Sequence, residues 1–233
     1  MNRRIHSSIL TLGTVAVVAG LLGLANPAGA SAASAKSASQ KAAAKKTLLA
    51  LSDMPKGWTS AKDSGDGSSN FPGAKQLAGC IGVSSSLIQS NPPQVNSPDF
   101  HSADQSLEID DSVAVFPSAK KAVATFNAMA NPKTPACMIT LMNGPLRDKI
   151  AKSAGSGATV GTVSVTRFSA PAHTTGLTIS LPITASNQSI TASITILTFV
   201  KGALSQQITF DSYGASFPSA LALHVIAVAQ KRL

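Results

Sequence analysis

Charged and aromatic side chains are scarce in this chain. Only 12% of its 233 residues are Asp, Glu, Lys or Arg, and 4% are Phe, Trp or Tyr. Proteins that bind nucleic acids present basic surfaces, often with stacking aromatic rings, so this composition excludes a nucleic-acid partner from our expectations. G-x-S-x-G, H-E-x-x-H and the phosphate-binding and dinucleotide-binding glycine motifs are also missing. We therefore expect no enzyme and no cofactor.

Long hydrophobic runs are missing too, apart from one near the start. Residues 9–25 form an apolar run of 17 residues, whereas a membrane-spanning helix needs about 20. Arg3 and Arg4 precede the run, and small residues at positions 28–32 follow it, which is typical of a cleavable secretory signal peptide. An uncleaved N-terminal anchor is the alternative. We expect cleavage of residues 1–32 and a secreted, extracytoplasmic protein with no stable membrane insertion.

The positive charge is concentrated before residue 47. Residues 33–46 are almost wholly Ala, Ser, Lys and Gln, which predicts a tether that buries no apolar surface. The net charge is +9, but residues 47–233 contain 13 basic and 10 acidic side chains, which leaves only +3 there. A solvated linker is the favoured interpretation, and contact of its lysines with an anionic cell-wall polymer is the alternative. Residues 47–233 suffice for one domain, which we expect to be monomeric.

Cysteine is nearly absent as well, with only Cys80 and Cys137. Neither has a histidine within four positions and no C-x-x-C occurs, which disfavours a metal-bound or reactive thiol. In an oxidising compartment we expect the two to form a disulfide. Because Cys80 does not directly follow the apolar run, we expect no lipid anchor.

Apolar periodicity predicts the fold class. Strands with alternating apolar residues are expected at 107–116, 177–184, 190–200 and 204–213, and short turns join the last three into a meander. Helices are expected at 45–52, 74–88, 118–129, from Thr134 onward, at 146–152 and at 219–231. Pro182 indicates a sheet edge or a bulge. The predicted fold is α+β: an antiparallel sheet of five to six strands, with helices packed on one face.

Asp110 and Asp111 are the only paired carboxylates. Asp111 shares the parity of the apolar residues of its strand, so either the pair forms a bulge or one carboxylate points inward. Adjacent strand residues point to opposite faces, which disfavours a general acid/base pair. The single tryptophan, Trp58, is typical of a core residue. Trp58 and Asp111 are nevertheless the two candidates for ligand contact.

Two other motifs have simpler interpretations than chemistry. His101 with Asp99 and Asp104 matches no standard ligand spacing, so we expect a solvated loop and no metal. Ser118 and Lys121 match the S-x-x-K motif of penicillin-recognising enzymes, but the companion S-D-N and K-T-G motifs are missing. We expect Ser118 to cap a helix whose lysines face solvent.

Two stretches carry a resemblance to known proteins. Residues 48–58 read LLALSDMPKGW, and Cys80 follows this stretch. Residues 113–122 read VAVFPSAKKA, and Cys137 follows this second stretch. Together they resemble exported actinobacterial proteins akin to the PknH-like extracellular sensor domain. The resemblance implies a sheet packed against helices around a cleft, and binding rather than catalysis. This chain has two cysteines where those sensor domains usually have two disulfides, and no binding residue can be carried over.

The function that we expect is a non-catalytic, sensor-like binding module of the cell envelope. A lipid or another apolar wall molecule is the expected ligand, because the predicted sheet faces offer Ile, Leu and Val but few charges. One alternative is a small envelope hydrolase or transferase that uses Ser118 and Lys121, or Asp110 or Asp111. Another is a structural wall protein held by its lysine-rich tether.

Overall fold

The computed structural model describes residues 30–62, 73–89, 92–154, 157–169, 171, 173–185 and 187–233. The predicted signal peptide lies outside the described residues except for its last three positions. None of the helices in the described ranges is both long enough and apolar enough to cross a bilayer.

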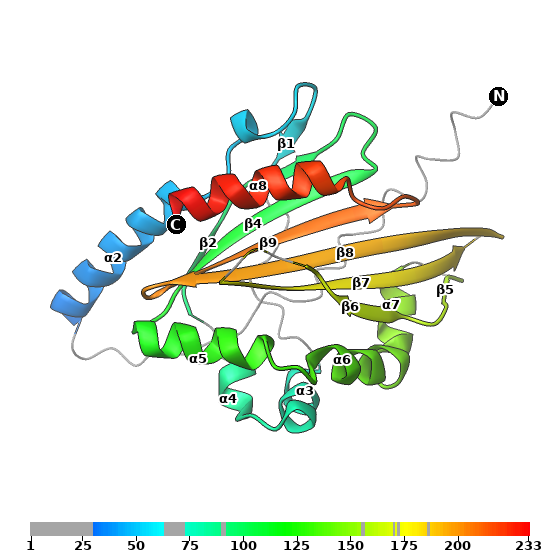
Figure 1. Ribbon diagram of the computed structural model, residues 1–233, viewed down its shortest axis with the longest axis horizontal. Coiled ribbons are helices and arrows are strands. Elements are labelled where there is room, and N and C mark those ends of the chain that lie inside the picture. The colour runs from blue at the N-terminus through cyan, green and yellow to red at the C-terminus, as the bar shows by residue number, and fades with distance from the viewer. Residues whose placement is uncertain are drawn as a thin grey trace.

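The centre of the described chain is one antiparallel sheet of nine strands (Figure 1). The strands are β1 (Thr59–Ala61), β2 (Gln94–Asn96), β3 (Asp99–His101), β4 (Leu107–Val115), β5 (Thr159–Val160), β6 (Ser164–Arg167), β7 (Thr174–Ala185), β8 (Gln188–Lys201) and β9 (Leu204–Tyr213). Their order is β1-β3-β4-β9-β8-β7-β5, while β2 also pairs with β4 and β6 with β7. The short strands β2 and β3 thus share one edge of β4, and β5 and β6 share one edge of β7.

Helices cover both faces of this sheet. They are α2 (Ala30–Thr47), the 3-10 turn η1 (Leu51–Asp53), α3 (Ala74–Ile81), α4 (Ser85–Ile88), α5 (Ala119–Met129), α6 (Thr134–Asn143), α7 (Arg147–Ser153) and α8 (Ser219–Arg232). Figure 1 shows α8 on one side of the strands and α5 and α6 on the other. The predicted α+β class with an antiparallel sheet is confirmed. The expected five to six strands were too few, because the short strands β1, β2, β3, β5 and β6 extend the edges of the sheet, and helices lie on two faces where one was expected.

Strand β8 shows why both faces need a cover. Ile194 and Ile196 pack into a core formed with α3, α6 and α7, whereas Leu197 and Phe199 pack into a second core formed with α8. Successive strand residues point to opposite faces, so these residues belong to two separate apolar layers. A sheet that is apolar on both faces must be covered on both.

The three long strands of the predicted meander are present as β7, β8 and β9. Asn187 has a φ of 62° in the first turn, and Gly202 has a φ of 59° in the second. Pro182 lies opposite the interruption between β5 and β6, where Gly161 N donates a hydrogen bond to the Pro182 carbonyl oxygen at 2.8 Å. A proline fits this position because no neighbouring strand requires an N–H from it there.

Strand β4 is regular throughout. Its nine residues pair with β9 without a break, from Leu107 opposite Ser212 to Val115 opposite Leu204. There is therefore no bulge at Asp110 and Asp111, and the alternative prediction, an inward-pointing carboxylate, is confirmed: Asp111 is 2% exposed.

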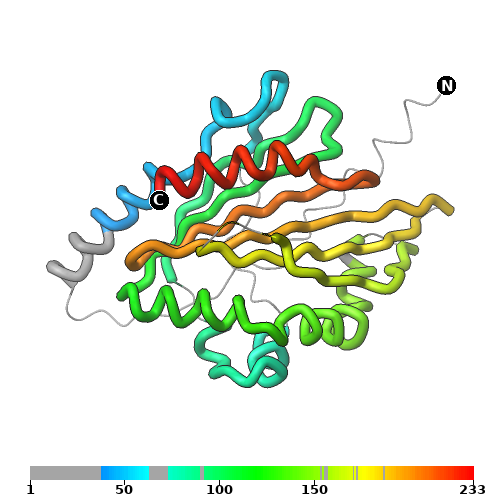
Figure 2. Tube along the Cα trace, in the orientation of Figure 1, coloured from blue at the N-terminus to red at the C-terminus, as the bar shows by residue number. Residues whose placement is uncertain are grey.

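The segment expected to be a tether, residues 33–46, is helical within α2. Alanine, lysine and glutamine are strong helix formers, which explains the helix in a stretch that has no apolar stripe. The end of α2 packs on the sheet, since Ala44 is fully buried with Val95, Val113 and Val115. Figure 2 shows this end of α2 beside the C-terminal end of α8.

The predicted disulfide is confirmed. Cys80 of α3 is bonded to Cys137 of α6, with 5.8 Å between their Cα atoms. The helix expected over residues 74–88 is divided into α3 and α4, because Gly82 ends α3 in the left-handed conformation with a φ of 78°.

Candidate functional site

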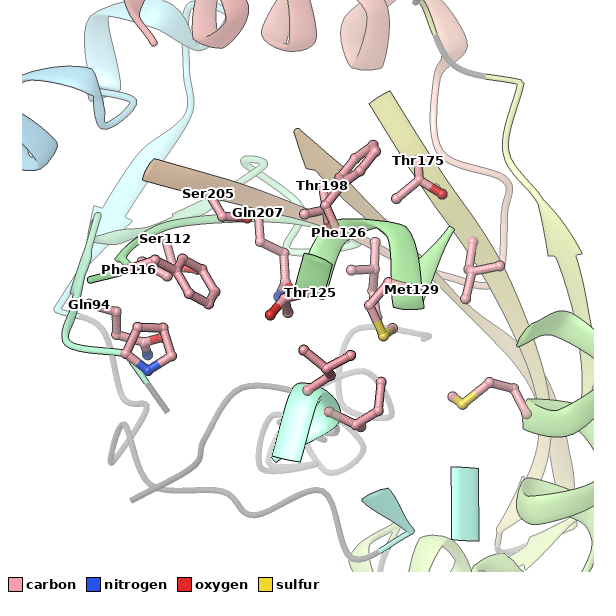
Figure 3. A pocket seen from close by; sticks show the side chains of 18 of the residues that line it. Gln94, Ser112, Phe116, Thr125, Phe126, Met129, Thr175, Thr198, Ser205 and Gln207 are labelled. Atoms are coloured by element: carbon pink, nitrogen blue, oxygen red, sulfur yellow. The ribbon is translucent and has the colours of Figure 1, made fainter. Parts of the chain in front are cut away.

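A pocket of about 180 Å³ lies between the sheet and the helices α4, α5 and α6. Figure 3 shows side chains from strands and helices converging on it.

The floor of the pocket includes a polar row that crosses four strands, beside apolar side chains of β7 and β8. Ser112 of β4 lies opposite Gln207 of β9, Gln207 lies opposite Thr198 of β8, and Thr198 lies opposite Thr175 of β7. Ser205 adds a fourth hydroxyl, two residues along β9 from Gln207. Alternation along each strand sends these side chains to the same face, so their polar atoms gather at one level.

The helical wall of the pocket is largely apolar, with Thr125 of α5 as a polar residue. Phe126 and Met129 of α5 point toward the floor (Figure 3) and are half-buried. Leu87 and Ile88 of α4 and Met138 of α6 complete this wall. Methionine side chains adapt their shape to different apolar partners, so this wall suits a ligand of variable outline.

No charged side chain is among the described residues that line the pocket. A charged ligand buried here would lose its hydration without gaining an ionic partner, which is costly. An apolar wall facing a hydroxyl and amide floor instead suits a neutral molecule with one apolar side and a few hydrogen-bonding groups. The volume is below the roughly 300–1,000 Å³ of pockets for drug-sized ligands, so a small molecule or one end of a longer molecule fits.

Asp111, one of the two residues expected to contact a ligand, lies on the opposite face of the sheet from the pocket. Its carboxylate accepts hydrogen bonds from Leu49 N at 2.8 Å and from Gln206 Nε2 at 2.9 and 3.0 Å. Burial raises the pKa of Asp111 to about 6, while these hydrogen bonds act in the opposite direction. The residue holds the chain that follows α2 against the sheet.

Trp58, the other candidate, also lies outside the pocket. It is half-buried and packs against the core formed with α8, which includes Phe100, Ile109 and Phe210. This is the core position that is typical of a single tryptophan.

The S-x-x-K residues form the beginning of a helix. The Ser118 side chain accepts a hydrogen bond from Lys121 N at 3.3 Å, and both residues are exposed. The expectation that Ser118 caps the helix is confirmed.

The loop residues around His101 separate into two groups. Asp104 accepts hydrogen bonds from Ser102 Oγ and Ser106 Oγ within its own loop, which holds its pKa below the usual value. Asp99 and His101 instead lie beside Glu108. Sequence spacing did not reveal this second group, because Glu108 comes from the next strand.

Sequence reasoning also missed the polar floor. Ser112 and Gln207 share a parity with other polar residues of β4 and β9, and such a face is normally read as solvent-facing. Only the pairing of the two strands and the helices above them turn this face into the floor of a pocket.

Comparison with known proteins finds similarity among solved structures alone. No protein-family model and no curated protein matches the chain. Among solved structures, the chain is similar to the crystal structure of the extracellular domain of PknH from Mycobacterium tuberculosis. The identity is 8%, the TM-score is 0.40, and the overlay covers 82% of this chain and 95% of that chain. A TM-score of this size supports no argument about function.

Proposed function

We propose that this chain is a non-catalytic, sensor-like binding module of the cell envelope, and that its pocket holds a small neutral ligand. The observation that carries the proposal is the composition of the pocket: an apolar wall from α4, α5 and α6 faces an uncharged polar floor. A lipid or another apolar molecule of the envelope has this chemistry, with its apolar part against Phe126 and Met129 and its hydroxyl or carbonyl group near Ser112.

Two features support a location outside the cytoplasmic membrane. The Cys80–Cys137 disulfide is typical of oxidising compartments. The first 32 residues have the pattern of a secretory signal peptide. In that setting, a neutral ligand from the envelope would reach the pocket without crossing the membrane.

The test is native mass spectrometry of the protein purified from its own host. We expect extra mass under native conditions that is lost on denaturation. A matched pair of variants connects this mass to the pocket: Ala114→Phe adds a ring at the floor, whereas Val123→Phe adds the same ring on α5, where Val123 is 42% exposed and does not line the pocket. Ala114→Phe should lose the extra mass, and Val123→Phe should keep it.

Other outcomes contradict the proposal. A bare protein from the host, with no rise in melting temperature on addition of host lipid extract, would remove the support for a lipid-binding role. Retention of the ligand by a correctly folded Ala114→Phe variant would place binding elsewhere.

A further inference from the structure

Strands β3, β4 and β9 bring four carboxyl side chains, a histidine and a tyrosine (Tyr213) together on the same sheet face as the pocket floor. In the pairing register, His101 lies opposite Glu108, and Glu108 lies opposite Asp211. Asp110 is two residues along β4 from Glu108, and Asp99 is two residues along β3 from His101. Like charges directly opposite one another destabilise a sheet, so Glu108 and Asp211 need a proton or a positive charge between them.

This carboxylate cluster is buried. Glu108 is 8% exposed and Asp211 is 6% exposed. Asp211 Oδ1 is fully buried and has no hydrogen-bond partner in the described part of the chain. Leaving a buried acceptor unpaired is unfavourable, which indicates that a group outside the described chain completes this site.

No basic side chain of the described residues lowers the pKa values of the cluster. Burial, and then the charge of Asp99, raises the pKa of Glu108 to about 7. Burial, and then the charge of Glu108, raises the pKa of Asp211 to about 8. The pKa of Asp110 is raised as well, mainly by burial and then by the charges of Glu108 and Asp211. The histidine of this group, His101, has its Nδ1 3.8 Å from Glu108 Oε2.

We propose that Glu108, Asp110 and Asp211 bind one divalent cation of the calcium class. One carboxylate oxygen of each residue lies within 4.8 Å of the others. Three oxygens at such separations can all reach an ion at the roughly 2.3–2.6 Å that Ca²⁺ prefers. Asp110 is only half-buried, so water can complete the coordination there. The ion supplies the missing positive charge and a partner for the carboxylate of Asp211.

The choice of ion follows from the ligand set. Three carboxylates are hard oxygen donors, which suit Ca²⁺, whereas Zn²⁺ sites usually include Cys or His. Mg²⁺ requires shorter, near-octahedral contacts and retains several waters, so it should bind less tightly here. The bound ion would join β4 to β9, two residues from Ser112 and four residues from Gln207 of the pocket floor.

The test uses the purified full chain after treatment with a chelator, titrated with CaCl₂ at pH 8. We expect calorimetry to give one ion per chain. At an ion concentration of about 100 times Kd, the melting temperature should rise by roughly 5–10 °C. MgCl₂ should give a smaller shift, and the affinity for Ca²⁺ should fall at pH 6, because the carboxylates must lose protons to bind the ion.

Two variants connect the ion to this cluster. Asp110→Asn and Asp211→Asn should each abolish most of the calcium-dependent shift. Both should still fold, because each removes an uncompensated charge, and their melting temperature without calcium should equal or exceed that of the wild type. Asp104→Asn is the control, since this carboxylate lies in the adjoining loop outside the cluster, and its calcium response should be unchanged.

Three results would overturn the proposal. A wild-type protein that shows no calcium response at pH 8 would mean that the cluster holds protons only. A calcium shift that persists in Asp211→Asn would place the ion elsewhere. Zinc binding that is lost in His101→Ala, without any calcium binding, would assign the site to Asp99, His101 and Glu108 instead.

Discussion

Asp110 and Asp111 are neighbours in the sequence, yet their carboxylates lie on opposite faces of the sheet. Asp111 accepts hydrogen bonds from Leu49 N and Gln206 Nε2, so its buried charge is compensated. Asp110 faces Glu108 and Asp211, and its burial, followed by the charges of these two residues, raises its pKa. The same residue type therefore stabilises the fold on one face and creates an electrostatic cost on the other.

We expect Asp111→Ala to lower the free energy of unfolding by about 2–3 kcal/mol, because it leaves Leu49 N and Gln206 without their acceptor. Denaturant unfolding of the variant measures this loss. Gln206→Ala is the second single variant of a double-mutant cycle with Asp111→Ala. Gln206 Nε2 also donates a hydrogen bond to the Thr47 carbonyl oxygen at 3.3 Å. The double variant should lose less than the sum of the two single losses. Additive losses would mean that the two side chains act independently.

Gly176 shows a constraint of a different kind. A Cβ at this position would overlap Leu197 Cδ2 and lie 3.0 Å from Phe168 Cβ. Leu197 is fully buried, so it can yield only by disturbing its neighbours in the core. Gly176→Ala should therefore cost about 1–3 kcal/mol of stability, as measured by chemical denaturation.

Gly79 is the matched control for this substitution. It lies within α3, and a Cβ there would meet nothing within 4 Å. Gly79→Ala should raise stability by up to about 1 kcal/mol, because alanine has the higher helix propensity. A similar destabilisation in both variants would contradict the packing explanation.

At the scale of elements, the disulfide joins two helices that cover the same sheet face. It closes a loop of 57 residues between α3 and α6. Replacing both cysteines by serine should lower the free energy of unfolding by about 4 kcal/mol in the chain-entropy description. Denaturant unfolding of this variant, compared with the oxidised wild type, measures the effect. A loss below about 1 kcal/mol would mean that packing alone holds α3 on α6.

The elements that could be predicted are those with long, regular apolar patterns. Strands β4, β7, β8 and β9 and helices α5, α6 and α8 follow the alternation or helical period of their residues. Strands β2 and β3 were not predicted because each has only three residues, in a stretch with three prolines, and their pairing partner β4 comes later in the chain. The helical conformation of residues 33–46 was missed because its composition was interpreted as that of a linker.

The sites could not be predicted in the same way. Glu108, Asp110 and Ser112 form a polar face of β4 that alternation assigns to solvent. Their partners on β9 lie about 100 residues away, and only the register places Asp211 beside Glu108 and Gln207 beside Ser112. Both the pocket floor and the carboxylate cluster therefore depend on a pairing that local sequence does not encode.

At the scale of the whole molecule, the carboxylate cluster should give an unusual dependence of stability on pH. The groups that face one another are Asp99 and His101 of β3, Glu108 and Asp110 of β4, and Asp211 and Tyr213 of β9. The pKa values of Glu108 and Asp211, about 7 and about 8 in the folded protein, exceed the value of roughly 4 expected after unfolding. Between these values the folded state binds more protons than the unfolded state.

The free energy of unfolding should therefore fall as the pH rises from about 5 to 9 in the presence of a chelator. Melting temperatures across this range measure the effect, and Asp211→Asn should flatten the curve. Asp104 acts in the opposite sense, since its lowered pKa favours the folded state at higher pH, but it is exposed and screened. A melting temperature that rises from pH 5 to 9 would contradict the burial of uncompensated carboxylates.

The strand order also has a consequence for the way in which the chain folds. Strands β7, β8 and β9 follow one another through short turns, so their contacts are local and can form early. Strand β4 must find β9 across about 100 residues of chain, which makes its docking a late and entropically costly step. Until then, β9 presents an unpaired edge to other molecules. We therefore expect refolding at high protein concentration to produce aggregates that form through the edge of β9. Refolding at low protein concentration should suppress them.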